Sequence, residues 1–200
     1  IFIIAYLLYV RCQFIFSFSI DLDGLEYYFV RIIQEMHQGK PMYENPLQFP
    51  YSINLYSPVY FYVFSSLVYL LKLNIYNDLH QILVVGRILS FFIVVIQLLI
   101  LVKLTKKFTS SNFIAIITIT LYILLISGHI YAVRPDALKT LFFVLFINYL
   151  TEYLFFSNKT KDAVMCICAA VLAVYTKQDI AVYTSLIFLI ALIFSPTKKT

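Results

Sequence analysis

The chain has few charged residues and few glycines, and these shortages exclude several classes of protein. Charged residues make up 12% of its 200 positions, only four positions are glycine, and hydrophobic residues reach 62%. An ordinary soluble domain is roughly 45–50% apolar. Because so little polar material is left for solvated loops, the composition predicts an all-α polytopic membrane protein, a single transmembrane helical bundle over residues 1–200.

Sequence patterns for several common kinds of active site are also missing. The chain has no CxxC pair, no HExxH motif and no glycine-rich loop that would cradle a phosphate. Its cysteines lie inside apolar stretches, where we expect small hydrophobic side chains rather than metal ligands: Cys12, Cys166 and Cys168. The net charge is +5, but no basic stripe alternates with aromatic residues. The partner expected for the basic charge is therefore a membrane lipid surface and not nucleic acid.

Several apolar segments come near the roughly 20 residues that a helix needs to cross a bilayer. They are residues 1–19, 82–102, 112–130, 138–156, 163–176 and 180–195. A further apolar segment, residues 57–71, is marginal for crossing. If it crossed, the lysine-bearing gaps that follow would move to the outer face. We therefore expect a re-entrant or interfacial helix there.

The polar residues between the apolar segments sort into two groups, and this sorting orients the chain. One group consists of lysines: Lys103, Lys106, Lys107, Lys159, Lys161, Lys198 and Lys199. The other is acidic or mixed: Asp21, Asp23, Arg134, Asp136, Lys177, Gln178 and Asp179. Because basic loops mark the cytoplasmic side, loops 103–111 and 157–162 are predicted to be cytoplasmic, with 20–80 and 131–137 external. A multi-pass protein of the bacterial inner membrane is expected, and the start at Ile1 indicates a fragment of a longer protein.

The acidic start of the first external loop is the first candidate site. Residues 25–38 have the apolar spacing of an amphipathic helix, with Asp23 as its N-cap and Glu26 in capping-box register. Together with Asp21, these carboxylates have the chemistry of a general base, and a divalent cation between Asp21 and Asp23 is a second option. The structural alternative is that Asp23 and Glu26 only cap the helix. Tyr27 follows directly and is included as a substrate-binding residue.

Two later turns and one helical arginine supply the other candidates. The guanidinium of Arg134 can bind a phosphate through two parallel hydrogen bonds, and Asp136 would orient it. The structural alternative is that Asp136 is an acidic residue in the first turn of a helix, where such residues are common. Lys177, beside Gln178, can bind a phosphate through its single localised positive charge. The structural alternative is a lysine that only extends its amine to the membrane–water interface. Arg87 lies inside an apolar segment, where an arginine faces a polar cavity or an acidic partner. A structural ion pair with a carboxylate of the first loop is the alternative for Arg87.

The order of these motifs resembles a known family of membrane enzymes. An apolar span and an external acidic pair are followed by "QGKPMYENP", "YSPVYFYVFSSLVYLL", "GRILS", "YAVRPDAL" and "YTKQDIAVY". This order is similar to the amino-terminal half of the GT-C glycosyltransferases, which include protein O-mannosyltransferases and aminoarabinose transferases. Those two subfamilies tend to carry a lysine-proline pair where this chain has Ser57 and Pro58, which argues against membership of either.

The resemblance implies a sugar donor linked to polyprenyl phosphate and used by an inverting transferase on the extracytoplasmic face, with a glycan, lipid or protein acceptor. It implies that Asp23, or Asp21 as second choice, is the catalytic base. It also implies that Arg134 and Lys177 hold the donor phosphate. The predicted substrate-binding residues are Glu26, Tyr27, Arg87, Arg134, Asp136, Lys177 and Gln178.

Two other functions fit the same residues. In a transporter or flippase for a lipid-linked or anionic substrate, these charges would line a path near the middle of the bilayer. The polar residues here cluster near one surface, which favours the enzyme. A non-catalytic subunit of a membrane assembly is the third possibility.

Overall fold

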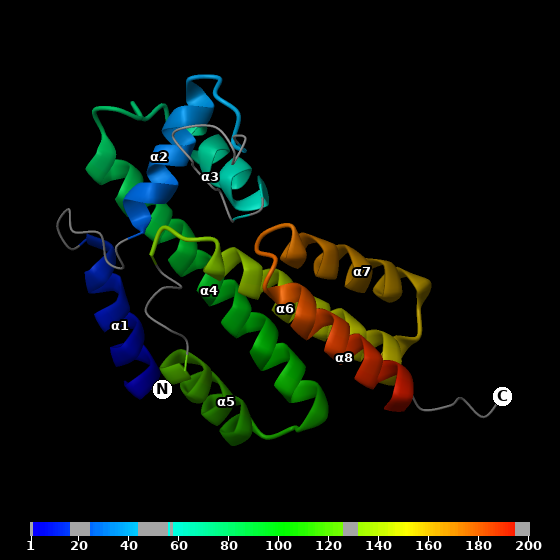
Figure 1. The fold of residues 1–200 in the computed structure, drawn as a ribbon. Coiled ribbons are helices and arrows are strands. Elements are labelled where there is room, and N and C mark those ends of the chain that lie inside the picture. The colour runs from blue at the N-terminus through cyan, green and yellow to red at the C-terminus, as the bar shows by residue number, and fades with distance from the viewer. Residues whose placement is uncertain (1, 17–24, 44–55, 57, 126–131, 195–200) are drawn as a thin grey trace.

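The computed structural model describes residues 2–16, 25–43, 56, 58–125 and 132–194, which are entirely helical or irregular, without a strand. Figure 1 shows how the helices are arranged. They are α1 (Phe2–Phe16), α2 (Glu26–His37), α3 (Pro58–Leu70), α4 (Leu79–Phe108), α5 (Asn112–Leu125), α6 (Asp136–Thr151), the π-helical segment η2 (Glu152–Ser157), α7 (Thr160–Val174) and α8 (Ile180–Phe194). The predicted all-α fold is confirmed over these residues, and each predicted apolar segment contains a helix.

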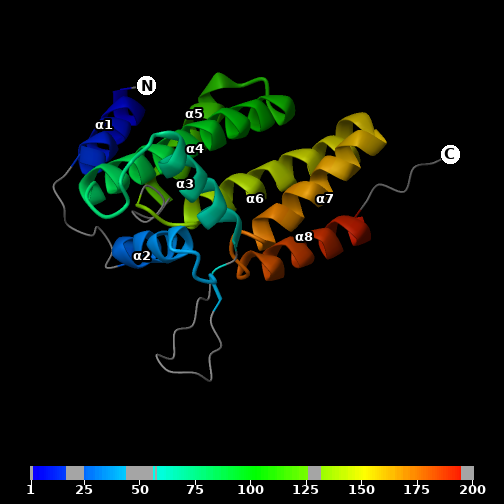
Figure 2. The same cartoon turned by 90° about the horizontal axis from the view of Figure 1, so that it is seen from above.

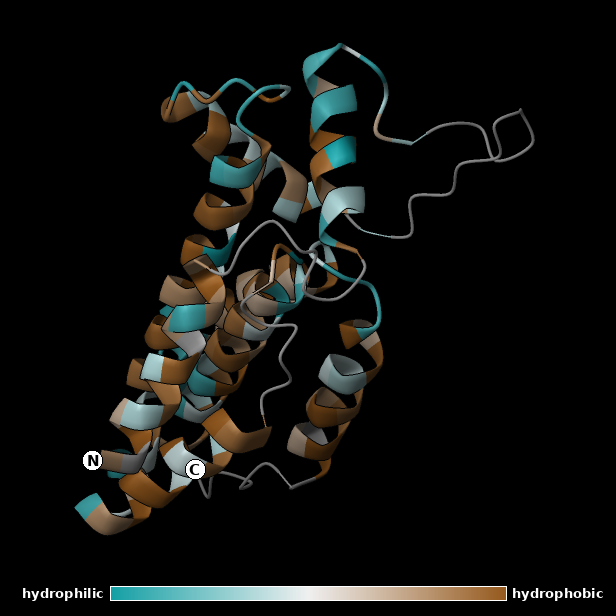
Figure 3. Ribbon diagram, turned by 90° about the vertical axis from the view of Figure 1, so that its left-hand side faces the viewer, coloured by the Kyte–Doolittle hydropathy of each residue, from teal (hydrophilic) through white to brown (hydrophobic). Residues whose placement is uncertain are grey.

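Two of the helices are long and apolar enough to cross a membrane. They are Leu79–Phe108, with 30 residues, and Asp136–Ser157, with 22 residues, in which α6 continues into η2. The other apolar helices are shorter, among them Pro58–Leu70 and Asn112–Leu125. Hydrophobic residues cover most of the length of these helices in Figure 3, whereas α2 carries several hydrophilic ones.

Helix α6 is the central element of the bundle, because it packs against α4 on one side and α7 on the other. Figures 1 and 2 both show this arrangement. Helices α4 and α6 run in the same direction, since Gln97 bonds to the carbonyl of Ala137 near the start of α6 and Lys107 pairs with Glu152 near its end. Gln97 also accepts a bond from Tyr122 of α5, so it links α4 to both α5 and α6.

The lysine-bearing turns lie together at one end of this bundle. Phe108, at the end of α4, packs edge-on against Phe155 and Phe156 of η2, and Lys107 lies over the ring of Phe156. The turn that follows η2 leads into α7 with Asn158 in the left-handed backbone region at φ 48°. The start of α6 and the turn between α7 and α8 therefore lie at the opposite end.

Helices α2 and α3 pack against the first half of α4 and form the main hydrophobic core with it. The buried side chains include Phe29, Ile33, Phe61, Phe64 and Leu83. The amphipathic helix expected over 25–38 is α2, with Phe29, Ile32 and Ile33 buried and Arg31 exposed. Gly86 of α4 permits the closest contact, because a Cβ there would lie 2.8 Å from both Phe64 and Val133. This close approach brings the chain segment before α6 against α4.

Candidate functional site

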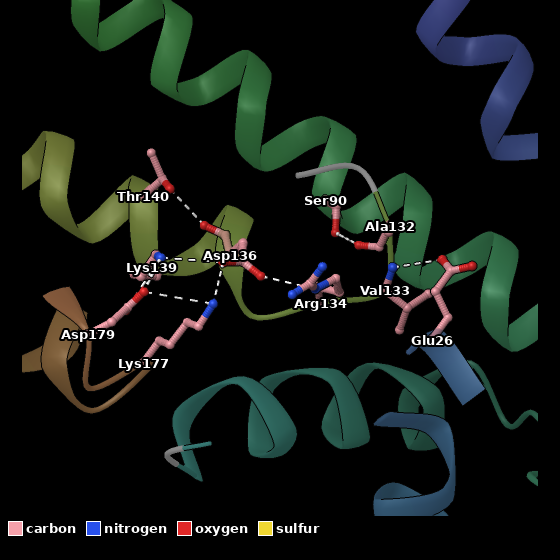
Figure 4. A network of polar contacts seen from close by, with 10 residues as sticks. All are labelled: Glu26, Ser90, Ala132, Val133, Arg134, Asp136, Lys139, Thr140, Lys177 and Asp179. Carbon is pink, nitrogen blue, oxygen red and sulfur yellow. Dashed lines mark hydrogen bonds and ion pairs between the residues drawn. The ribbon is translucent and has the colours of Figure 1, made fainter. Parts of the chain in front are cut away.

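The segment 132–136, which leads into α6, connects two polar centres. Its buried start contacts α4, where Ser90 donates a hydrogen bond of 2.9 Å to the carbonyl of Ala132. The backbone N–H of Val133 donates to Glu26 of α2 at 2.8 Å. The next residue, Arg134, turns to the other side, toward Asp136 at the start of α6. Figure 4 shows Glu26 beside Val133 at one end of this segment and the side chains around Asp136 at the other.

The first centre is a buried ion pair between α2 and α4. Arg87 Nε lies 3.0 Å from Glu26 Oε1, and its terminal Nη2 lies 2.6 Å from Oε2, so the pair is bidentate. Both side chains are 0% exposed. A charge removed from water in this way is tolerated only with a partner of opposite sign and good hydrogen bonds. Arg87 and Glu26 therefore hold the start of α2 against α4.

The ion pair decides between the alternatives for both residues. The structural alternative for Arg87, an ion pair with a carboxylate of the first loop, is the one found. In this arrangement neither Arg87 nor Glu26 presents its charge to a substrate. The capping-box prediction for Glu26 is wrong, because α2 begins at Glu26 with Leu25 at the N-cap; Asp23, the predicted cap, lies outside the described residues. The Glu26 carboxylate binds Arg87 and Val133 instead, because the buried arginine needs the charge.

The second centre collects three cationic side chains around Asp136. Lys177 Nζ lies 2.8 Å and Lys139 Nζ 3.3 Å from its Oδ1, and Arg134 Nε lies 3.2 Å from its Oδ2. An Asp179 carboxylate oxygen lies 3.1 Å from Lys139 Nζ and 3.8 Å from Lys177 Nζ. Three cations around two carboxylates leave an excess of one positive charge, and cations this close keep Asp136 ionised.

The first loop also reaches this second centre. Lys177 lies over the ring of Tyr56, 5.7 Å from its centroid, in cation–π geometry. At the start of α3, the N–H of Val59 donates to the carbonyl of Tyr175, just before the turn that carries Lys177. Within the first loop, α2 therefore contacts the segment 132–136, and Tyr56 and the start of α3 contact the residues at the turn between α7 and α8.

The structure brings together three of the residues singled out from sequence: Arg134, Asp136 and Lys177, although 41 residues separate Asp136 from Lys177. Arg87 does not join them, because it pairs with Glu26. Gln178 is exposed in the same turn, and Tyr27 is exposed on α2. Asp21 and Asp23, the predicted base and cation ligands, lie outside the described residues. Among the residues described, no group of three or more His, Cys, Asp or Glu side chains could hold a metal ion.

Sequence reasoning missed Lys139 as a member of the site. It lies three residues after Asp136, on the same face of the first turns of α6, and this spacing was the available signal. Ser90 was also missed. It lies one helical turn after Gly86 and Arg87 on the face of α4 that contacts the segment 132–136.

Open apolar cavities lie elsewhere, between α6, α7 and α8. One has a volume of about 240 Å³ and is lined by Tyr153, Ala163, Cys166 and Phe188, among others. It is near the lysine-bearing end, not at Asp136. All three cysteines are free, and only Cys166 is buried.

Comparison with known proteins adds no assignment. No family model, no curated protein and no solved structure matches this chain.

Proposed function

We propose that this chain is the amino-terminal, membrane-spanning part of a GT-C-like glycosyltransferase. It moves a sugar from a polyprenyl-phosphate donor to an acceptor hydroxyl on the extracytoplasmic face of a bacterial inner membrane. The observation that carries the proposal is the cluster of Arg134, Lys139 and Lys177 around Asp136, at the end of the bundle opposite the lysine-bearing turns. A phosphate that leaves a sugar carbon needs this kind of fixed positive charge.

In the proposed reaction, the acceptor oxygen attacks the anomeric carbon of the sugar. Asp23 takes the acceptor proton, and the bond from the anomeric carbon to the phosphate oxygen breaks. Polyprenyl phosphate leaves with the bonding electrons, and the configuration at the anomeric carbon inverts. Lys177 and Arg134 stabilise the charge that develops on the phosphate. No step requires a metal ion, and a divalent cation at Asp21 and Asp23 remains the alternative to a simple base.

The position of the charges supports an enzyme over a transporter. A transporter places its binding groups near the middle of the bilayer, at the ends of broken helices. Here the accessible charges lie at the first turn of α6 and in the turn between α7 and α8. Arg87 is matched one to one by Glu26 and fully buried, so it adds no free charge inside the bundle.

The direct test is transfer of radiolabelled sugar from a polyprenyl-phosphate donor in membranes that contain the full-length protein. Transfer to an endogenous or added acceptor, above membranes that lack the protein, is the expected result. If the purified full-length protein transferred no sugar from any of a panel of hexosyl and pentosyl donors, the proposal would be wrong.

The proposal also predicts a topology that single cysteines can test. Ser110 and Thr160 are exposed in the two lysine-bearing turns, and Gln178 is exposed at the opposite end. In a background without native cysteines, an impermeant maleimide should label Gln178→Cys in intact cells. Ser110→Cys and Thr160→Cys should be labelled only after the cells are opened. Labelling of Ser110→Cys in intact cells would reverse the orientation and remove the site from the extracytoplasmic face.

A further inference from the structure

The two polar centres differ in how their charges are balanced. In the Glu26–Arg87 pair, one cation meets one carboxylate with no exposure to solvent. Around Asp136, three cations meet two carboxylates: Asp136 contacts all three, and Asp179 contacts the two lysines. The side chains of Arg134, Asp136, Lys139 and Lys177 remain 13–21% exposed. The first centre is closed and neutral, whereas the second is partly exposed and carries one excess positive charge.

The cations around Asp136 come from three different parts of the chain. Arg134 belongs to the segment before α6, Lys139 to the beginning of α6, and Lys177 to the turn between α7 and α8 (Figure 4). Their positive charges repel one another, so an anion among them is needed to keep them close. Asp136 also lies in the first turn of α6, where the helix dipole favours negative charge. The anion that now meets both needs is the side chain of Asp136.

We propose that Arg134, Lys139 and Lys177 form a binding site for a phosphate ester, and that Asp136 occupies this site when no ligand is bound. Asp136 is then a competitor of the ligand and not one of its binding groups. A phosphate brings more oxygens and more negative charge than a carboxylate, so it satisfies all three cations at once. The identification of the ligand with the polyprenyl phosphate of the donor rests on the proposed function.

This competition predicts opposite effects for neighbouring substitutions. Asp136→Asn removes the internal anion while it keeps the side-chain shape, so the affinity for a prenyl phosphate should rise roughly threefold or more, by analogy with the removal of one partly exposed ion pair. Lys139→Gln and Lys177→Gln each remove one charge-assisted hydrogen bond to the ligand. Each should weaken binding roughly tenfold or more.

The test is binding of a radiolabelled short-chain prenyl phosphate to the full-length protein in phosphatidylcholine nanodiscs. The matched control is Lys161→Gln, which removes a lysine at the opposite end and should leave the affinity unchanged. Thermal unfolding of each variant checks that it is folded. Competition by inorganic phosphate would show that the phosphate group alone is recognised, and competition only by prenyl phosphates would assign a lipid ligand. Either result supports the site.

Three results would overturn the proposal: equal binding of the prenyl alcohol, weaker or unchanged binding by Asp136→Asn, or unchanged binding by Lys139→Gln. The lysine variants decide the question if Asp136→Asn does not accumulate. Because the assay measures binding, its result is separate from sugar transfer. Tight phosphate binding without sugar transfer would refute the proposed enzyme but support the phosphate site. Sugar transfer together with unchanged binding by Asp136→Asn would support the enzyme but refute the proposed competition by Asp136.

Discussion

Replacement of Arg87 by methionine should lower the free energy of unfolding by about 3–5 kcal/mol, the cost of breaking a buried ion pair from one side. Methionine fills a similar volume but leaves the Glu26 carboxylate buried without its cation. The carboxylate then keeps its bond from the Val133 N–H at 2.8 Å and loses the two from the guanidinium. Chemical unfolding in detergent micelles, followed by circular dichroism, measures the change.

The chain offers a matched control in an arginine pair that is exposed to solvent. Arg31 binds Glu35 at 2.9 Å on the surface of α2, with the arginine side chain 67% exposed. Arg31→Met should cost less than about 1 kcal/mol, as exposed pairs do. The double variant Glu26→Leu with Arg87→Leu should be less destabilised than Arg87→Met, because no buried charge is left. An Arg87→Met protein as stable as Arg31→Met would refute the structural role of the pair.

Replacement of Asp23 by asparagine should reduce sugar transfer by roughly 10²–10⁴-fold, the usual contribution of a general base. Asparagine has the same shape but cannot accept the proton of the acceptor hydroxyl. Since Leu25 occupies the N-cap of α2, neither Asp23→Asn nor Asp23→Ala should lower stability through a lost cap. Transfer rates and thermal unfolding are measured on the same preparations of full-length protein.

Asp21→Asn is the control for this prediction and should have a milder effect on the rate. An equal loss in Asp21→Asn and Asp23→Asn, restored by added Mn²⁺ or Mg²⁺ in either variant, would indicate a shared cation in place of a single base. Transfer by Asp23→Asn at close to the wild-type rate would show that the catalytic assignment is wrong.

The helices were predictable from sequence because apolar length is a local property. Each apolar segment gives a helix within a few residues of the expected limits, and the marginal segment 57–71 gives α3 (Pro58–Leu70). The convergence of Arg134, Asp136 and Lys177 was also predictable, because the sorting of charges between segments assigns them to one end of the bundle. No information on distant contacts was needed for either result.

The pairing of Glu26 with Arg87 could be suggested but not decided from sequence. The two residues are 61 positions apart, and local capping rules offered Glu26 a different role. The decision depends on packing: Gly86 lets α4 approach Phe64 and Val133, which encloses Arg87 and forces it to take the nearest carboxylate. The local preference for a helix-capping role is overridden where a buried charge would otherwise lack a partner of opposite sign. Lys139 was missed for the related reason that its partner Asp179 lies 40 positions away.

The short distance along the chain between Val133 and Asp136 has a consequence for how such a protein can evolve. Val133 is fixed to α2 through its N–H, and Asp136 is fixed to Lys139 of α6 and to Lys177 in the turn between α7 and α8. Side chains in this interval can change as long as the backbone bond and the charges persist. An inserted or deleted residue would move one centre away from its partners. Related chains should therefore vary freely in the length of their other turns while this interval keeps the same number of residues.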